Sequence, residues 1–243
     1  MASIQVFPDS EAQTRAAIDL FITCAQAAIE ERGVFSVALS GGSTPEKLYS
    51  GLADPVRQDD IDWMNIHLFF GDERHVPPDH PDSNFLMVHE ALFSKVSIPE
   101  SNIHRVKAEL DPRIAAFSYE EALRRFFMGQ RPHFDLVLLG MGIDGHTASL
   151  FPRTAGLNEE QRWFIANQLP AQGDWRLTLT KHAINAARKV VVLVSGSSKA
   201  DMLSEVLAGR HDPFRKPIQF ISPTEGEMFW LLDREAASQL SNV

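Results

Sequence analysis

Short apolar runs alternate along the chain with longer segments in which apolar residues recur every three or four positions. The apolar runs predict β-strands, and the helical spacing predicts α-helices. The predicted strands are Phe35–Leu39, Ile66–Phe70, Phe134–Leu139, Phe164–Asn167, Arg176–Thr180, Val190–Val194 and Met228–Leu232. The predicted helices are Glu11–Glu31, Pro45–Leu52, Asn84–Leu92, Pro112–Phe127, Lys181–Ala187, Ser198–Leu207 and a short segment after Asp233. This alternation, with continuous Val/Leu runs in the strands, predicts an α/β fold with a largely parallel sheet flanked by helices.

Several predicted strands end in loops that carry glycine and polar residues. They are Ser40–Ser43, Gly71–Arg74, Gly140–Gly142 and Ser195–Lys199. Ligands of parallel α/β sheets bind beyond the carboxyl ends of the strands. We therefore expect these four loops to face one crevice.

The loop after Leu139 contains a carboxylate and an imidazole, Asp144 and His146, among three glycines. Glycine allows sharp turns and lets a ligand approach the backbone closely. A carboxylate two residues before a histidine can orient the ring and select its tautomer. The pattern favours a general base at His146; the alternative is a structural histidine that is hydrogen-bonded to a carbonyl.

The loop Ser40–Pro45 leads from a strand into a helix, and Pro45 suits the first helical turn. Either Ser43 or Thr44 fits the N-cap position. The free amides of Gly42 to Thr44 and the helix dipole would hold a phosphate, although a simply capped helix is the alternative. Neither the Walker A spacing nor Gly-x-Gly-x-x-Gly is present. In the loop after Val194, Lys199 is either a second contact to the same phosphate or a solvated lysine.

Two more segments supply charged candidates. In Gly71–Arg74, Arg74 is expected to face an anion while Asp72 or Glu73 orients neighbouring groups, unless the loop is merely solvated and salt-bridged. In Arg176–Thr180, the alternation predicts that the leucines face the core and that Arg176 points the other way.

Composition narrows the choice of function. The 243 residues include 23 basic and 32 acidic side chains, a net charge of −9, which argues against a nucleic-acid surface but allows a small anionic ligand. No apolar run approaches the ~18 residues of a membrane span. No signal-peptide pattern is visible, and Cys24 is the single cysteine, so we expect a cytoplasmic protein. The scattered histidines lack metal-site spacing, and we expect no metal.

These motifs resemble those of the 6-phosphogluconolactonase family. The matching pieces are Ser40–Pro45, Gly71–Arg74 with the segment through Asn84, Gly140–Pro152, Arg176–Thr180 and Gly196-x-x-Lys199-Ala200, in the family's order. The resemblance implies one domain over residues 1–243 with a Rossmann-like sheet. It also implies hydrolysis of 6-phospho-D-glucono-1,5-lactone to 6-phosphogluconate, in the oxidative pentose phosphate pathway, without a cofactor.

On this resemblance the site residues take specific roles. The amides of Gly41, Gly42, Ser43 and Thr44, together with Arg176 and Lys199, would hold the phosphate. His146 would remove a proton from water as it attacks C1, and Asp144 would orient the ring. Arg74 would stabilise the oxyanion or bind the phosphate, with Asp72 and Glu73 in support. No Gly-x-Ser-x-Gly elbow is present, so a covalent acyl-enzyme is not favoured.

Two other functions share these features. A glucosamine-6-phosphate deaminase has a similar Asp-Gly-His turn but continues with Ile-Ala-Phe-Asn-Glu-Pro, where this chain has Thr147–Pro152. A non-catalytic sugar-phosphate-binding module is the second. The expected partner is a small-molecule sugar-phosphate lactone, with no nucleic acid or membrane; the sequence is compatible with a monomer and does not fix the oligomeric state.

Overall fold

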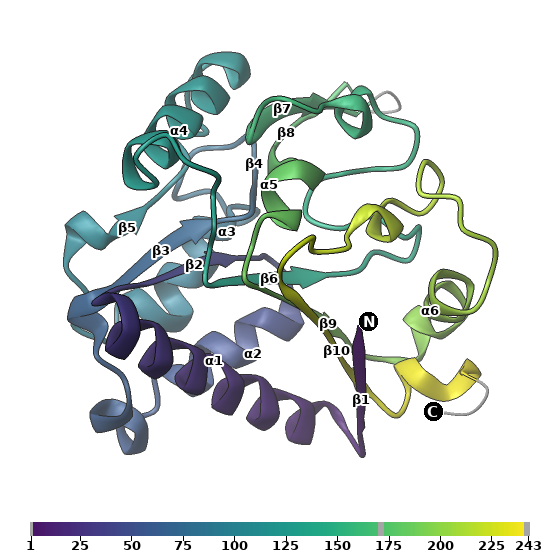
Figure 1. Cartoon of the computed structure of the whole chain (residues 1–243), viewed down its shortest axis with the longest axis horizontal. Helices are drawn as coiled ribbons and strands as arrows, with labels where there is room; N and C mark the ends of the chain where they lie inside the picture. The colour runs from purple at the N-terminus through teal and green to yellow at the C-terminus, as the bar shows by residue number, and fades with distance from the viewer. Residues whose placement is uncertain (1, 170–172, 241–243) are drawn as a thin grey trace.

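A computed structural model describes residues 2–169 and 173–240. Its centre is a seven-stranded, all-parallel sheet in the order β1-β10-β9-β6-β2-β3-β5 (Figure 1). These strands are β1 (Ser3–Phe7), β2 (Phe35–Leu39), β3 (Ile66–Phe70), β5 (Ile103–His104), β6 (Leu136–Gly140), β9 (Lys189–Val194) and β10 (Glu227–Asp233). The predicted α/β class and parallel sheet are confirmed.

A second, three-stranded antiparallel sheet has the order β4-β8-β7. Its strands are β4 (Asp72–Arg74), β7 (Phe164–Gln168) and β8 (Trp175–Leu179). Two of the predicted strands therefore lie outside the parallel sheet. Leu177 and Leu179 are fully buried, as the alternation predicts, but Thr178 on the opposite face is also fully buried because another loop covers it.

The α-helices are α1 (Ser10–Arg32), α2 (Ser43–Leu52), α3 (Asn84–Val88), α4 (Pro112–Phe126), α5 (Lys181–Asn185) and α6 (Ala200–Leu207). The short turns are η1 (Pro55–Asp60), η2 (Trp63–Asn65), η3 (His89–Phe93), η4 (Glu100–Asn102), η5 (Ala155–Asn158), η6 (Ser197–Lys199), η7 (Pro217–Phe220) and η8 (Ala236–Gln239). Two predicted helices change character within their length. The helix predicted to start at Asn84 passes into a π-helical turn, η3, and the one predicted from Ser198 begins as the 3₁₀ turn η6.

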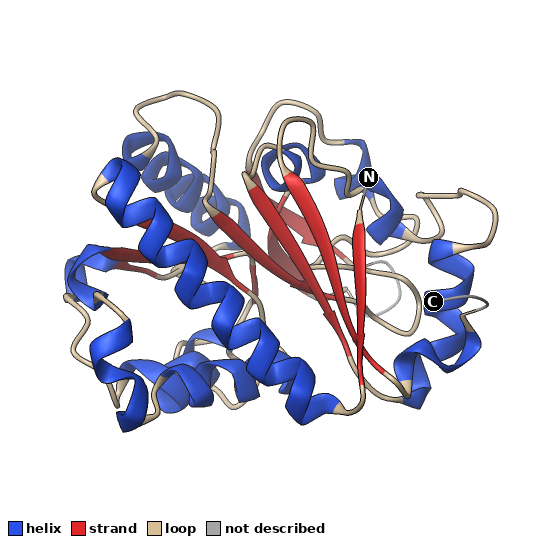
Figure 2. Ribbon diagram, turned by 60° about the horizontal axis from the view of Figure 1, so that its bottom comes forward, coloured by secondary structure: helices blue, strands red, loops and turns tan. Residues whose placement is uncertain are grey.

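Helices and the small sheet enclose the parallel sheet from its two sides. Helices α1 and α2 pack side by side on one face, while the small sheet and α4 lie on the other (Figures 1 and 2). The buried residues of α1 recur at helical spacing, from Ala17 through Phe21 to Ala28, and Phe21 packs edge-on against the fully buried Phe35 of β2, with the ring centroids 5.3 Å apart. This apolar contact is the main source of stability for such a layered fold.

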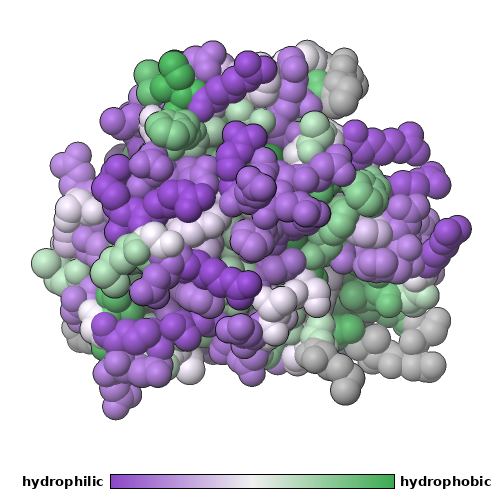
Figure 3. Space-filling view, turned by 45° about the horizontal axis from the view of Figure 1, so that its top comes forward, coloured by the Kyte–Doolittle hydropathy of each residue, from purple (hydrophilic) through white to green (hydrophobic). Residues whose placement is uncertain are grey.

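The face of the molecule drawn in Figure 3 is mainly hydrophilic. In the face shown in Figure 3, small hydrophobic patches are separated by hydrophilic ones. Across the described ranges, every helix is too short or too polar to cross a bilayer.

The strand order places a topological switch point between β2 and β6. From β2 the chain continues to β3 on one side of it, whereas β6 returns to pair with β2 on the other side. The connections that leave the carboxyl ends of these two strands diverge, which opens a crevice between them. The loops with candidate chemistry begin at this edge.

Candidate active site

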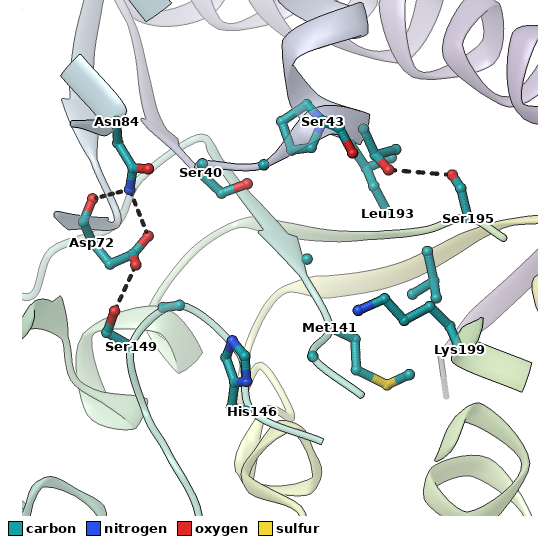
Figure 4. Close-up of a pocket in the computed structure, with 18 of the residues that line it drawn as sticks. Ser40, Ser43, Asp72, Asn84, Met141, His146, Ser149, Leu193, Ser195 and Lys199 are labelled. Carbon is teal, nitrogen blue, oxygen red and sulfur yellow. Dashed lines mark hydrogen bonds between the residues drawn. The ribbon is translucent and has the colours of Figure 1, made fainter. Parts of the chain in front are cut away.

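One cavity of about 370 Å³ lies at the switch point. It is lined by Ser40, Gly41, Gly42, Ser43, Thr44, Pro45, Asp72, Arg74, Asn84, Gly140, Met141, Gly142, His146, Ala148, Ser149, Phe151, Arg176, Leu193, Val194, Ser195 and Lys199 (Figure 4). All four predicted loops contribute to this lining. Of the predicted site residues, only Asp144 and Glu73 are not part of the wall.

The loop after β6 holds a carboxylate–imidazole pair. Asp144 Oδ1 lies 2.5 Å from His146 Nδ1 and also accepts the His146 amide at 3.1 Å. Phe151 stacks on a face of the imidazole ring, with the ring centroids 4.2 Å apart. Nδ1 donates to the carboxylate, so Nε2 carries the free lone pair of the neutral ring. This is the arrangement of an oriented general base.

The charge of Asp144 is maintained by its partner. Partial burial raises the pKa of Asp144, but the hydrogen bonds and charge of His146 outweigh it and hold that pKa below its ordinary value. The carboxylate therefore stays ionised and fixes the ring.

Gly142 provides the space in which this pair sits. A Cβ at position 142 would lie 2.1 Å from His146 Nδ1 and 2.6 Å from Asp144 Oδ1. The turn is closed by the Gly142 amide, which donates to the His146 carbonyl at 2.8 Å, and Gly145 has a φ of 78°. Two of the three glycines of this loop are thus required by close approach and by backbone conformation.

The N-terminus of α2 opens directly into the cavity. Its N-cap residue is Gly42, and no side chain forms a capping hydrogen bond there, so the expected cap at Ser43 or Thr44 is wrong. Gly42 takes a φ of 105°, a backbone conformation that lets the chain turn into the helix without a capping side chain. Helix amides that no side chain caps, together with the positive end of the helix dipole, form a site for an anion.

Lys199 approaches the same space from the loop after β9 (Figure 4). Burial lowers the pKa of Lys199, and the negative charge of Asp144 partly opposes this shift. The start of this loop is held by Asp233 at the end of β10, whose carboxylate accepts a hydrogen bond from the Gly196 amide at 3.0 Å.

A buried glutamine connects this loop to the rest of the fold. The Gln13 side chain is fully buried and donates to the carbonyls of Val194 (2.9 Å) and Leu231 (2.6 Å). Its oxygen accepts the hydroxyl of Ser195, whose own oxygen is 3.4 Å from Thr44 Oγ1. Helix α1 thereby ties the ends of β9 and β10 to the wall of the cavity.

Two arginines reach the cavity from the small antiparallel sheet. Arg74 on β4 and Arg176 on β8 are direct cross-strand partners, and both line the cavity. The Arg74 guanidinium donates to the carbonyl of Asp82, and that of Arg176 donates to the carbonyl of Trp175 at 3.1 Å. With Lys199 they give the lining of the cavity three cationic side chains.

Asp72 is the only carboxylate among the lining residues. Its side chain accepts Ser149 Oγ at 2.7 Å and faces Asn84 Nδ2 at 3.4 Å (Figure 4). Burial raises the pKa of Asp72 above its ordinary value, although the Ser149 hydrogen bond and the charges of Arg74, His146 and Arg176 lower it in part.

Glu73 serves the backbone rather than the cavity. Its buried carboxylate accepts the amides of Arg74 (2.8 Å), Asn84 (2.7 Å) and Phe85 (2.8 Å). It therefore holds the start of α3 against β4 and sets the position of Arg74. Burial nevertheless raises the pKa of Glu73 above its ordinary value.

Sequence reasoning did not single out Gln13, Asn84 or Ser149. Gln13 carries a visible signal, because it is a polar residue on the apolar stripe of α1, four positions before Ala17. Asn84 and Ser149 each lie inside a motif already noted, but their partner Asp72 is 12 and 77 residues away. Only the folded chain reveals these contacts.

Together, the fold and the cavity define an α/β protein in which an uncapped helix N-terminus and an imidazole held by a carboxylate line the same cavity. A family model described as glucosamine-6-phosphate isomerases/6-phosphogluconolactonase matches residues 8–230. The chain belongs to this family.

Individual relatives are similar over nearly the whole chain. A 6-phosphogluconolactonase of Nostoc sp. is 43% identical over 98% of both chains, and one of Synechocystis sp. is 48% identical over 88% of both. The solved structure of 6-phosphogluconolactonase from Trypanosoma cruzi superposes with a TM-score of 0.86 at 29% identity, covering 99% of this chain and 97% of that one.

Proposed function

We propose that this protein hydrolyses 6-phospho-D-glucono-1,5-lactone to 6-phosphogluconate, in the oxidative branch of the pentose phosphate pathway. The observation that carries the proposal is that His146, held by Asp144 from behind the wall, and the uncapped N-terminus of α2 line the same cavity. The relatives named as 6-phosphogluconolactonases support the choice of substrate.

The phosphate end of the substrate is held by the helix terminus. The amides from Gly41 to Thr44 donate to the phosphate oxygens, and Lys199 and Arg176 supply opposite charge. Holding the remote phosphate fixes the lactone carbonyl next to His146, so that binding energy is used for orientation.

The chemical step needs a water and a base. His146 Nε2 takes a proton as the water oxygen forms a bond to C1, and the carbonyl electrons move to the oxygen. The tetrahedral intermediate then collapses: the bond from C1 to the ring oxygen breaks, and the protonated imidazole returns its proton to that oxygen. Arg74, fixed through Glu73 and Asp82, stabilises the oxyanion.

We also propose that the enzyme acts in the cytoplasm. Its one cysteine, Cys24, is a free thiol, which is the usual state in reducing compartments.

The test is direct. The phosphorylated lactone is generated in situ, and acid release is followed with and without the protein. We expect rapid hydrolysis of this lactone and much slower hydrolysis of unphosphorylated gluconolactone. Ammonia release from glucosamine 6-phosphate, or tight binding of 6-phosphogluconate without turnover of the lactone, would overturn the proposal.

A further inference from the structure

Ser40 lies where β2 ends and the anion-binding loop begins. Its backbone is held firmly by Tyr49 of α2: the Ser40 amide donates to the phenolic oxygen at 3.0 Å, and the phenol donates to the Ser40 carbonyl at 2.8 Å. Tyr49 is fully buried, and Ser40 is 4% exposed. The Ser40 hydroxyl therefore lines the cavity from a rigid support (Figure 4).

This hydroxyl is unusual in the protein. Within residues 2–169 and 173–240, Ser40 Oγ is the one buried side-chain oxygen or nitrogen without a hydrogen-bond partner. Other buried serines have partners: Ser36 Oγ on the same strand donates to Asp135 at 2.8 Å, and Ser149 Oγ donates to Asp72 at 2.7 Å. A buried polar group without a partner is unfavourable in the free protein, so its presence in a ligand cavity calls for a ligand atom.

The position of Ser40 in the chain indicates which part of the substrate its hydroxyl would contact. On one side the chain runs directly into the amides of Gly41 to Thr44, which hold the phosphate in the proposed function. On the other side β2 pairs with β6, whose following loop carries His146. Ser40 and His146 both line the cavity, so in the proposed function we expect the middle carbons of the lactone, C2 to C4, to lie near Ser40.

We propose that the Ser40 hydroxyl forms a hydrogen bond with one ring hydroxyl of the sugar lactone and is a specificity-determining residue. This inference rests on the proposed function and adds the recognition of the sugar itself. A serine hydroxyl both donates and accepts, as a sugar hydroxyl does. A lactone that lacks this hydroxyl leaves Ser40 unpaired, and a site built to pair a hydroxyl rejects such a substrate strongly.

The substitution Ser40→Ala gives two effects of opposite sign. The free protein should become more stable, with a melting temperature about 2–4 °C higher, because an unpaired hydroxyl is removed. The kcat/KM for the phosphorylated lactone should fall about tenfold, because the contact to the sugar is lost. Ser36→Ala is the matched control on the same strand: it should lower the melting temperature and leave kcat/KM unchanged.

A series of substrates decides the matter. Phosphorylated lactones without a hydroxyl at C2, C3 or C4 are compared on the native protein and on Ser40→Ala. For one of them the ratio of native to variant kcat/KM should fall to about one. If the ratio is the same for all three, if Ser40→Ala acts on the parent lactone as the native protein does, or if it melts at a lower temperature, the inference is wrong. Failure of the native protein to hydrolyse the parent lactone would instead reject the proposed function.

Discussion

At the scale of single residues, the Asp144–His146 pair requires a glycine at position 142. The substitution Gly142→Ala would place a methyl group 2.1 Å from His146 Nδ1, closer than any real contact, so the ring must move. Displacement of a general base by about 1 Å costs on the order of 100-fold in rate. We expect kcat to fall by this factor while affinity for 6-phosphogluconate stays near native, measured by steady-state kinetics and by titration of the product.

Gly140 is the comparison for this prediction. A Cβ at position 140 meets no atom within 4 Å, so Gly140→Ala should affect kcat far less than Gly142→Ala does. Equal losses for the two variants would show that the loop is sensitive to any added methyl group and would contradict the specific clash.

The sequence indicated the pair itself because Asp144, His146 and the glycines around them are adjacent in the chain. It did not indicate Gln13, whose partners Val194 and Leu231 are 181 and 218 residues away. It also predicted Ser43 or Thr44 as the N-cap of α2, whereas the N-cap residue is Gly42. The side-chain pattern predicts where a helix begins. Whether a side chain caps its N-terminus depends on the tertiary structure around that terminus, which here is the cavity.

At the scale of elements, the small antiparallel sheet delivers two guanidinium groups to one wall of the cavity. Arg74 and Arg176 are cross-strand partners. The proposed function gives them different roles, and steady-state kinetics can separate these roles. In the proposed function Arg74 acts on the oxyanion, so we expect Arg74→Ala to lower kcat about 100-fold with a small change in KM. The same proposal has Arg176 bind the phosphate, so Arg176→Ala should instead raise KM. A rise in KM alone for Arg74→Ala would assign that residue to the phosphate as well.

The neighbouring strands β3 and β5, at one end of the parallel sheet, carry a pair of imidazoles that should make stability depend on pH. His67 Nδ1 and His104 Nε2 are 3.1 Å apart, and His104 stacks on Phe69 at 4.1 Å. Burial, and then the charge of His67, lower the pKa of His104 to about 4. The unfolded chain therefore binds more protons than the folded protein as pH falls from ~6.5 to about 4, and the free energy of unfolding decreases over this range.

The variant His104→Gln removes the His104 part of this dependence and keeps a group able to form a hydrogen bond; burial also lowers the pKa of His67, which stays in both proteins. Urea unfolding at pH 7 and pH 5 should show that the native protein loses about 1 kcal/mol more than the variant, once solvent screening of a partly exposed ring is allowed for. The buried carboxyl groups of Asp72 and Glu73 act in the opposite direction, since burial raises the pKa of each, but they are common to both proteins. Parallel losses in the two proteins would exclude His104 as the source.

Element prediction succeeded where a strand is buried on both faces. The strands Phe35–Leu39 and Ile66–Phe70 have the predicted bounds. A continuous apolar run of this length is typical of a strand that is buried on both faces of a sheet. The strand β1 was not predicted, since Ser3–Phe7 is short and half-exposed at the sheet edge. The two sheets were not separated either, because β7 and β8 have the length and apolar content of core strands, and their antiparallel pairing is a property of the fold rather than of either segment.

At the scale of the whole molecule, the cavity and the surface have opposite charge. The chain has a net charge of −9, yet Arg74, Arg176 and Lys199 face the cavity. A dianionic substrate is attracted locally and repelled at a distance, and salt weakens the exposed part of the attraction. We expect kcat/KM for the phosphorylated lactone to fall several-fold between roughly 20 and 200 mM salt.

Two measurements give this prediction its controls. Lys199→Met should make kcat/KM less dependent on salt, because one of the three cations is gone. Unphosphorylated gluconolactone is neutral and should show no such dependence on the native protein. A salt effect of the same size on the neutral lactone would mean that salt acts on the protein and not on the attraction of the anion.

The path of the chain has a consequence for the synthesis of this protein. Among the described strands, β1 pairs with β10 alone; β10 also pairs with β9, and its Leu231 carbonyl accepts the Gln13 side chain. Residues 3–7 therefore have no strand partner until residues 227–233 have been synthesised. We expect chains truncated before residue 227 to be degraded rather than partly active, because β1, β9 and Gln13 then lack these partners.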